Sequence, residues 1–274
     1  MEQKKSSILI GTSGFSYDDW IGPVYPEGIQ KGDMLRYYSH ELGFKVVELN
    51  FTYYTMPSPR VFESMLKETP EDFYFVVKAH SSMTHKIRAE DGSFLRDEGA
   101  FEAFLKGVEP LTQAGRLKCA LAQFPMKFNR TADAVEHLKW VAESLKSIRL
   151  TVEFRNSAWV SQSVFNTLKS LDVGYCVVDE PDLPGLVPFT PVVTASPAYV
   201  RYHGRNPKWF NTPINVRYDY LYPESELRGT LGDMARITRS ADETLVFFNN
   251  HFRGSAVKNA KMMIELLGAG QEAV

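Results

Sequence analysis

Eight short runs rich in β-branched and aromatic residues recur along the chain, and a helical pattern follows almost every one of them. Strands that alternate with helices in this way are typical of parallel βαβ units. The predicted strands cover residues 8–14, 45–50, 72–80, 117–124, 149–155, 173–179, 198–205 and 244–251. The predicted helices cover residues 33–42, 59–68, 99–114, 131–146, 161–171, 224–239 and 255–267. Eight such units predict an α/β fold, a (β/α)8 barrel of the TIM type.

The connection between the sixth and seventh predicted strands departs from this pattern. Residues 180–197 contain five prolines and almost no helical periodicity, which predicts an irregular but ordered sixth crossover. No repeat, low-complexity tract or linker divides the 274 residues, so we predict one domain over residues 1–274. A doubly wound open sheet is the competing architecture, but the chain lacks the glycine fingerprint of that fold.

The composition narrows the class of protein without naming a partner. Hydrophobic residues make up 44% of the chain and charged residues 23%, as in soluble globular proteins. A net charge of −2 gives no global positive field, although it does not exclude a local basic cleft. The first apolar stretch ends at Gly11, too early for a signal peptide, and no segment approaches about 18 continuous apolar residues. Cys119 and Cys176 lie in apolar runs without metal-ligand spacing, so we expect buried, reduced thiols, a cytoplasmic location and no membrane partner.

Polar residues gather toward the ends of the predicted strands. Alternate side chains of each barrel strand point into the interior, and barrel enzymes place their active sites at the C-terminal strand ends. The polar residues assigned to the inward parity are Glu48, Asn50, Lys78, His80, Gln123, Glu153, Arg155, Asp179, Arg201, His203, Arg205, Asn249 and His251. Any one of them could have a purely structural role, because the two members of a buried ion pair such as Glu153 with Arg201 can serve solely to neutralise each other. The whole set nevertheless predicts a mixed-charge pocket at the barrel mouth.

Cations outnumber carboxylates in this set, which favours an anionic ligand such as a phosphate or a carboxylate. The cations are Lys78, Arg155, Arg201 and Arg205, and the carboxylates are Glu48, Glu153 and Asp179. The leading hypothesis is an enzyme of hydrolase type that acts on a phosphate-bearing substrate. In that hypothesis Glu48 or Glu153 is the general base or acid, His203 is a second proton carrier, and the other polar residues bind substrate.

Aromatic residues are concentrated in the loops that follow the first, second and seventh predicted strands. They are Phe15, Tyr17, Trp20 and Tyr25, then Phe51, Tyr53 and Tyr54, then Trp209, Phe210, Tyr218 and Tyr220. Rings beside cations could stack bases or sugars, or could pack over the barrel top. Trp209 lies between Pro207 and Pro213 and is a candidate lid and substrate-binding residue. The alternative function is therefore a non-catalytic module that binds single-stranded nucleic acid.

Other chemistries leave weaker traces in the sequence. The chain has no Gly-x-Ser-x-Gly elbow, phosphate-binding loop or His-Glu-x-x-His helix. Residues that could hold a divalent metal ion are Glu48, His80, Glu153, Asp179, His203 and His251. The interleaved lysine and arginine side chains disfavour a dication, so we predict no cofactor. A metal-dependent endonuclease-like enzyme and a glycosidase-like enzyme with two carboxylates remain further alternatives.

Motifs spread over nearly the whole chain resemble those of a known family. The segments are Gly11-Thr12-Ser13-Gly14, Glu48-Leu49-Asn50, Gln123-Phe124-Pro125, Glu153-Phe154-Arg155, residues 199–204, Arg217-Tyr218-Asp219-Tyr220 and residues 248–251. Together they are similar to the YecE-like family, a domain of unknown function. The resemblance implies a TIM barrel with a site at its mouth, but no established reaction. Phe15 and Phe51 depart from the family pattern, which usually has a tryptophan and a small polar residue there.

Overall fold

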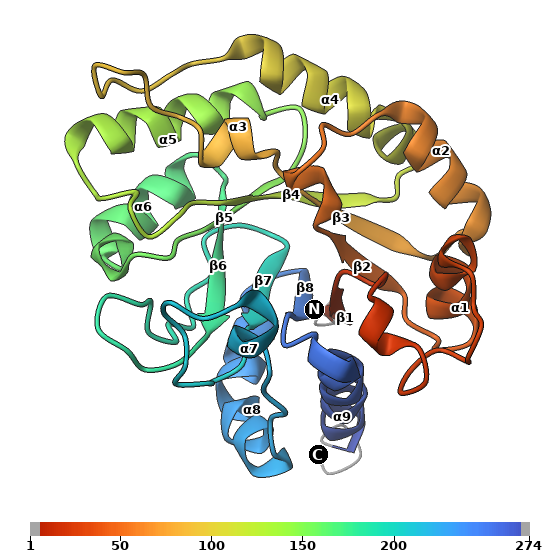
Figure 1. The fold of residues 1–274 in the computed structure, drawn as a ribbon. Helices are drawn as coiled ribbons and strands as arrows, with labels where there is room; N and C mark the ends of the chain where they lie inside the picture. Colours follow the sequence, from red (N-terminus) through yellow and green to blue (C-terminus); the bar gives the residue numbers. More distant parts are fainter. Residues whose placement is uncertain (1–5, 270–274) are drawn as a thin grey trace, which may run out of the picture.

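The computed structural model describes residues 6–269 and forms a closed barrel of eight parallel strands (Figure 1). The strands are β1 (Ser7–Ser13), β2 (Val46–Leu49), β3 (Tyr74–Lys78), β4 (Leu117–Gln123), β5 (Leu150–Glu153), β6 (Gly174–Asp179), β7 (Ala198–Tyr202) and β8 (Glu243–Phe248). Each strand pairs with the next one along the chain, and β8 pairs with β1 to close the ring. The predicted barrel architecture is confirmed.

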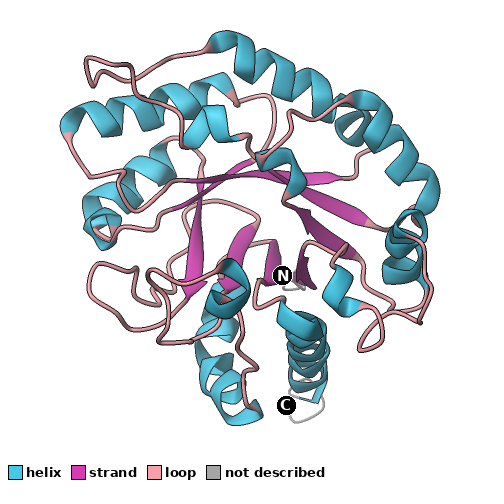
Figure 2. Cartoon of the chain, in the orientation of Figure 1, coloured by secondary structure: helices cyan, strands magenta, loops and turns pink. Residues whose placement is uncertain are grey.

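Helices lie around the outside of the strands (Figure 2). Those that match the predicted helices are α1 (Met34–His40), α2 (Pro59–Glu68), α4 (Glu98–Gln113), α5 (Ala132–Ser144), α6 (Gln162–Ser170), α8 (Glu224–Arg239) and α9 (Ser255–Ala269). The shorter elements, which the sequence does not predict, are α3 (Ser81–Thr84), α7 (Ile214–Arg217), η1 (Asp18–Trp20), η2 (Lys31–Asp33), η3 (Phe51–Tyr53), η4 (Ser157–Trp159) and η5 (Phe252–Gly254). No helix in the described part of the chain combines the length and apolar character that a membrane span requires.

Side-chain caps fix where several of the outer helices begin. The Asp97 carboxylate accepts a hydrogen bond from the Ala100 backbone N–H at 3.1 Å, and the Thr131 hydroxyl accepts one from Ala134 at 3.2 Å. Each bond satisfies a backbone donor that the first helical turn leaves without a partner. These local signals set the helix boundaries and hence the lengths of the loops over the barrel mouth.

The sixth crossover contains no helix, as predicted. Residues 180–197 run without regular structure from β6 to β7. Thr194 ties this segment to the barrel, because its hydroxyl accepts from the Tyr175 N–H at 2.7 Å and donates to the Val173 carbonyl at 2.6 Å. Glu180 Oε1 also accepts a hydrogen bond from the Val187 N–H at 3.0 Å. Hydrogen bonds of these side chains therefore hold the segment in place, as a helix does in the other crossovers.

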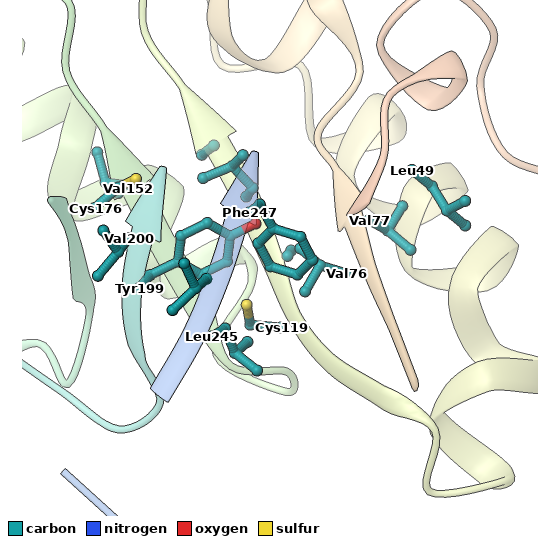
Figure 3. Packing of buried hydrophobic residues seen from close by; sticks show 14 of the residues in the cluster. Leu49, Val76, Val77, Cys119, Val152, Cys176, Tyr199, Val200, Leu245 and Phe247 are labelled. Atoms are coloured by element: carbon teal, nitrogen blue, oxygen red, sulfur yellow. The ribbon is translucent and has the colours of Figure 1, made fainter. Parts of the chain in front are cut away.

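The barrel interior is a packed apolar core beneath the polar mouth. Val76, Cys119, Leu245 and Phe247 are buried and lie close together between their strands (Figure 3). In β3 and β4 these side chains share the inward parity of the polar residues that end the same strands. The two cysteines are both buried and free, as expected. The closed floor leaves the C-terminal face as the place where polar groups reach solvent.

The inward parity predicted for Asp179 is wrong. Asp179 is in register with Tyr202, and the Tyr202 hydroxyl lies 2.9 Å from Thr230 Oγ1 of the outer helix α8, so both residues face the helices. On the opposite parity, Cys176 lies 4.0 Å from Glu153 Oε2 in the interior. Every residue of β6 is buried, so an alternation of polar and apolar residues could not reveal which side faces inward.

Seven of the eight predicted strands end one to three residues earlier than expected, and their predicted last residues belong to loops. His80 follows β3 and caps α3, where its Nδ1 accepts a hydrogen bond from the Ser82 N–H at 3.3 Å. Arg205 follows Gly204, whose φ of +91° turns the chain out of the strand direction. His137 on α5 is buried and stacks on Phe94 with ring centroids 4.4 Å apart.

Candidate functional site

A cavity of about 760 Å³ opens at the C-terminal ends of the strands. Its volume lies within the roughly 300–1,000 Å³ of typical small-molecule sites. Residues predicted from the sequence to bind substrate that line it are Asn50, Lys78, Gln123, Arg155, Arg201, Trp209, Asn249 and His251. The structure therefore brings together polar side chains from strands that are far apart in the sequence.

Arg201 lies at the centre of the charged floor of this cavity. Its Nη1 lies 2.5 Å from Glu153 Oε2, and its Nη2 lies 2.6 Å from Glu48 Oε1 and 3.2 Å from Ser13 Oγ. The second oxygen of Glu48 accepts a hydrogen bond from the Tyr199 hydroxyl at 2.7 Å. These groups come from β1, β2, β5 and β7, and the two carboxylates are fully buried. One guanidinium thus joins strands on different sides of the barrel.

Arg155 continues the network at the upper edge of the floor. Its Nε lies 2.5 Å from Glu153 Oε1, and its Nη1 donates to Glu180 Oε2 at 2.9 Å. Burial alone would raise the pKa of Glu153, but Arg155 and Arg201 outweigh it and hold that pKa well below its ordinary value. Glu153 is therefore a fixed carboxylate that orients two arginines. Burial raises the pKa of Glu180, whose partner Arg155 opposes the shift.

His203 packs against the same carboxylate from the side of β7. The Asn249 amide nitrogen lies 3.0 Å from His203 Nδ1, and His203 Nε2 lies 3.3 Å from Glu153 Oε1. An amide nitrogen donates, so Nδ1 accepts and the proton of the neutral ring is on Nε2, facing Glu153. Burial, together with the nearby Arg155, holds the pKa of His203 well below its ordinary value. The ring is accordingly uncharged at neutral pH.

Lys78 ends β3 and lines the cavity. Its Nζ donates to Gln123 Oε1 at 2.8 Å and lies 4.9 Å from the centre of the Tyr53 ring. Among residues 6–269, no carboxylate lies within 4 Å of this ammonium. Burial and the charge of Arg201 lower the pKa of Lys78 to about 8. Lys78 is thus a cation that readily gives up its proton.

Arg217 adds a second cation that forms no ion pair with a carboxylate of the described residues. It ends the short helix α7 in the long loop after β7, donates from Nε to the Trp209 carbonyl at 2.9 Å and lies over the Trp209 ring. Sequence reasoning did not assign Arg217 to the site, because it lies far from any strand end. The motif Arg217-Tyr218-Asp219-Tyr220 was the only signal that could have found it.

Aromatic rings form much of the remaining wall. They are Phe15, Tyr17, Phe51, Tyr53, Tyr54, Trp209, Phe210 and Tyr218. Tyr17 stacks on His251 with ring centroids 4.5 Å apart, and its hydroxyl donates to the Ser13 carbonyl at 2.6 Å. Trp20 and Tyr25, by contrast, are buried below the mouth and act as packing. The aromatic loops therefore divide into a cavity wall and a hydrophobic support.

Several predicted site residues lie outside the cavity wall. Glu48, Glu153 and His203 are fully buried behind it, and His80 caps α3. Asp179 accepts two hydrogen bonds from Arg205, at 2.9 and 2.6 Å, and a third from the Tyr222 hydroxyl at 2.6 Å. This clamp fastens β6 to the start of the loop after β7, on the helix-facing side.

The donor set offers little to a metal ion. Within residues 6–269, no three His, Cys, Asp or Glu side chains gather in an arrangement suited to one. Glu48 and Glu153 converge on the Arg201 guanidinium and do not line the cavity. This geometry therefore lacks the pair of carboxylates facing the substrate that a glycosidase uses. The groups that line the site are lysine and arginine cations, amides, aromatic rings and the imidazoles of His85 and His251.

Comparisons with known proteins agree on one family. The chain matches the model for "Protein of unknown function DUF72" over residues 9–274. It is 33% identical over 272 residues to the UPF0759 protein YunF of Bacillus subtilis (strain 168), covering 95% of this chain and 94% of that protein. A crystal structure of a DUF72 family protein from Thermotoga maritima has a TM-score of 0.89 at 44% identity, covering 96% of this chain and 99% of that one. One from Enterococcus faecalis V583 has a TM-score of 0.82 at 27% identity, covering 95% of each chain. The chain belongs to the DUF72 family.

Proposed function

We propose that the protein is an enzyme of hydrolase type that binds an anionic, phosphate-bearing substrate in the barrel-mouth cavity. One observation carries this proposal: the lysine and arginine side chains of the lining, Lys78, Arg155, Arg201 and Arg217, face the cavity, and no aspartate or glutamate is among its lining residues. A concave surface whose lysine and arginine side chains are not accompanied by carboxylates concentrates anions and strengthens their binding where water is partly excluded.

The cations have two different roles in this proposal. Arg155 and Arg201 are held rigidly by buried carboxylates, so their guanidinium groups are preorganised for a phosphoryl group. Lys78 and Arg217 have no carboxylate within 4 Å among the described residues, so their charge is left for the ligand. The aromatic rings and the amides of Asn50, Gln123 and Asn249 would orient the rest of the substrate.

In this proposal the residue that transfers protons is Lys78, which the sequence alone did not suggest for this role. Glu48, Glu153 and His203 lie behind the wall and hold one another and the arginines in place, so they are positioning residues. Lys78 lies in the wall with a pKa of about 8. Its uncharged amine can accept a proton from a water molecule as that water attacks phosphorus and the ester P–O bond breaks.

The test is a panel of phosphomonoesters and phosphodiesters, with release of the alcohol or of phosphate as the readout. We expect turnover of at least one class, with kcat reduced by about 100-fold or more in Lys78→Met. Arg217→Met should mainly raise KM, because it removes a binding charge. Lys139→Gln on the exposed face of α5 makes the same charge change outside the cavity and serves as the matched control. No turnover across the panel, or equal losses in Lys139→Gln, would refute the proposed activity.

A second candidate function is non-catalytic binding of single-stranded nucleic acid. Exposed rings at the cavity rim favour it, because Phe51, Tyr54 and Phe210 are 36%, 72% and 44% exposed. If it holds, oligonucleotide affinity falls steeply as salt rises, and Tyr54→Ala weakens binding by about 1–3 kcal/mol. Affinity that is absent, or insensitive to both salt and Tyr54, eliminates this candidate.

A further inference from the structure

Lys78 has the surroundings of a reactive amine. Its nearest polar partner is the neutral amide oxygen of Gln123, at 2.8 Å, and the Gln123 Nε2 donates in turn to the Phe124 carbonyl at 3.4 Å. That second bond turns the amide oxygen toward the amine. Nζ lies over the Tyr53 ring, and both residues line the cavity.

Burial is the main reason that the neutral form of Lys78 is favoured, and the charges around the amine act in both directions. Arg201 on β7 and Arg155 after β5 oppose protonation, while Glu153 on β5 and Glu48 on β2 favour it. The two carboxylates bond to the arginines and not to Lys78. A desolvated lysine beside other cations, with no acidic partner of its own, is the arrangement that makes an amine nucleophilic near neutral pH.

We propose that the Lys78 amine condenses with an aldehyde or ketone group of the phosphate-bearing ligand and forms an imine inside the cavity. The nitrogen lone pair attacks the carbonyl carbon, the C–N bond forms, and the proton lost from nitrogen passes to the former carbonyl oxygen. A second proton from solvent then converts that hydroxyl into water, which leaves as the C=N bond forms. One amine, one carbonyl group and one proton give one protonated imine and one water, without oxidation or reduction.

The same wall can hold both ends of such a ligand. Arg155, Arg201 and Arg217 line the cavity together with Lys78, so a phosphate held by the arginines places the remainder of a small molecule near the amine. This inference rests on the anion-binding part of the proposed function, and it adds the carbonyl group to the substrate class. It does not depend on hydrolysis, because an uncharged amine can serve as base or as nucleophile.

Reductive trapping with pyridoxal 5′-phosphate and borohydride tests this inference. Pyridoxal without the phosphate is the matched probe, and peptide mapping by mass spectrometry locates each secondary amine. We expect labelling of Lys78 to outpace that of the exposed Lys139 and Lys258, with a half-maximal rate near pH 8. Lys78→Arg keeps the cation but cannot form the imine, so it loses that label alone. Pyridoxal should label Lys78 about tenfold more slowly than its phosphate does, or slower still, whereas the two probes should label Lys139 at similar rates.

The outcomes separate this inference from the proposed function. If Lys78 is labelled no faster than Lys139 and Lys258, the imine is refuted, whether or not phosphoesters bind. If Lys78 is labelled selectively but equally fast by pyridoxal and by its phosphate, the reactive amine stands and anion binding by the cavity is contradicted. Thermal unfolding of Lys78→Arg beside the wild type verifies that the variant is folded.

Discussion

Arg201 shows how a single residue organises the charged interior. Its guanidinium bonds to Glu48 and Glu153, which are fully buried and reach it from different strands. Taking these three charges out of water is costly, and only their mutual attraction and hydrogen bonds offset that cost. The arrangement holds the arginine rigidly, with its charge presented to the cavity.

Replacing Arg201 with methionine should therefore destabilise the fold strongly. The change leaves both carboxylates buried without their cation, and we expect the free energy of unfolding to fall by about 3–5 kcal/mol. Chemical denaturation measures this loss. Arg228→Met on the exposed surface of α8, which breaks only an i,i+4 pair with Glu224, is the control and should cost about 0.5 kcal/mol or less. A loss of that small size for Arg201→Met would show that the network is dispensable.

Lys78 should make stability depend on pH in the alkaline range. Its pKa is lowered from 10.5 to about 8, so between these values the unfolded chain binds a proton that the folded protein has released. The contribution of Lys78 to stability accordingly rises with pH through this window and is constant below pH 8. Relative to Lys78→Met, the free energy of unfolding of the wild type should rise by roughly 1–3 kcal/mol from pH 8 to pH 10.5. A value near the lower end is expected if solvent screens the charge. Parallel stability curves for the two proteins would contradict the lowered pKa.

At the scale of elements, the barrel depends on close approaches between helices and loops that only glycine permits. Gly107 on α4 packs against the backbone of Pro57, which precedes α2, and a Cβ placed at Gly107 would lie 2.4 Å from the Pro57 carbonyl oxygen. The Pro57 backbone belongs to the segment that joins η3, beside the cavity, to α2. This contact thus links the outer helix layer to the site.

Gly107→Ala should destabilise the protein by about 1–3 kcal/mol, because the clash is with backbone and cannot be relieved by a rotamer change. Gly232→Ala on α8 makes the same chemical change where no atom lies within 4 Å, and it should stabilise by about 0.5–1 kcal/mol through helix propensity. Thermal unfolding of both variants measures the two effects. Shifts of the same sign would rule out the packing explanation.

Much of this architecture could be predicted from the sequence, for physical reasons that particular residues make plain. Runs of β-branched residues and helices of 7–16 residues leave a periodic pattern, whereas α3 and α7, with four residues each, are too short to show one. Arg217 was missed because it lies in the long loop after β7, far from any strand end. Asp179 was misplaced because β6 is buried on both faces, and the pattern cannot tell one buried face from the other.

At the scale of the whole molecule, cations and carboxylates lie at different depths around the cavity. The chain carries a net charge of −2, yet the described residues that line the barrel-mouth cavity include lysine and arginine but no aspartate or glutamate. The carboxylates Glu48, Glu153 and Glu180 lie behind the wall, where they hold the arginines in place. Composition cannot reveal such sorting, because it depends on which side of each strand end a charge occupies.

Calorimetric titration of inorganic pyrophosphate into the protein tests the cationic cavity most directly. The informative variant combines Lys78→Met with Arg217→Met, because neither change strands a carboxylate within 4 Å in the described part of the chain. We predict that the wild type and Lys139→Gln bind pyrophosphate with equal affinity and that the double variant binds it at least about tenfold more weakly. Equal affinity in all three proteins, or no binding to the wild type, would contradict the account.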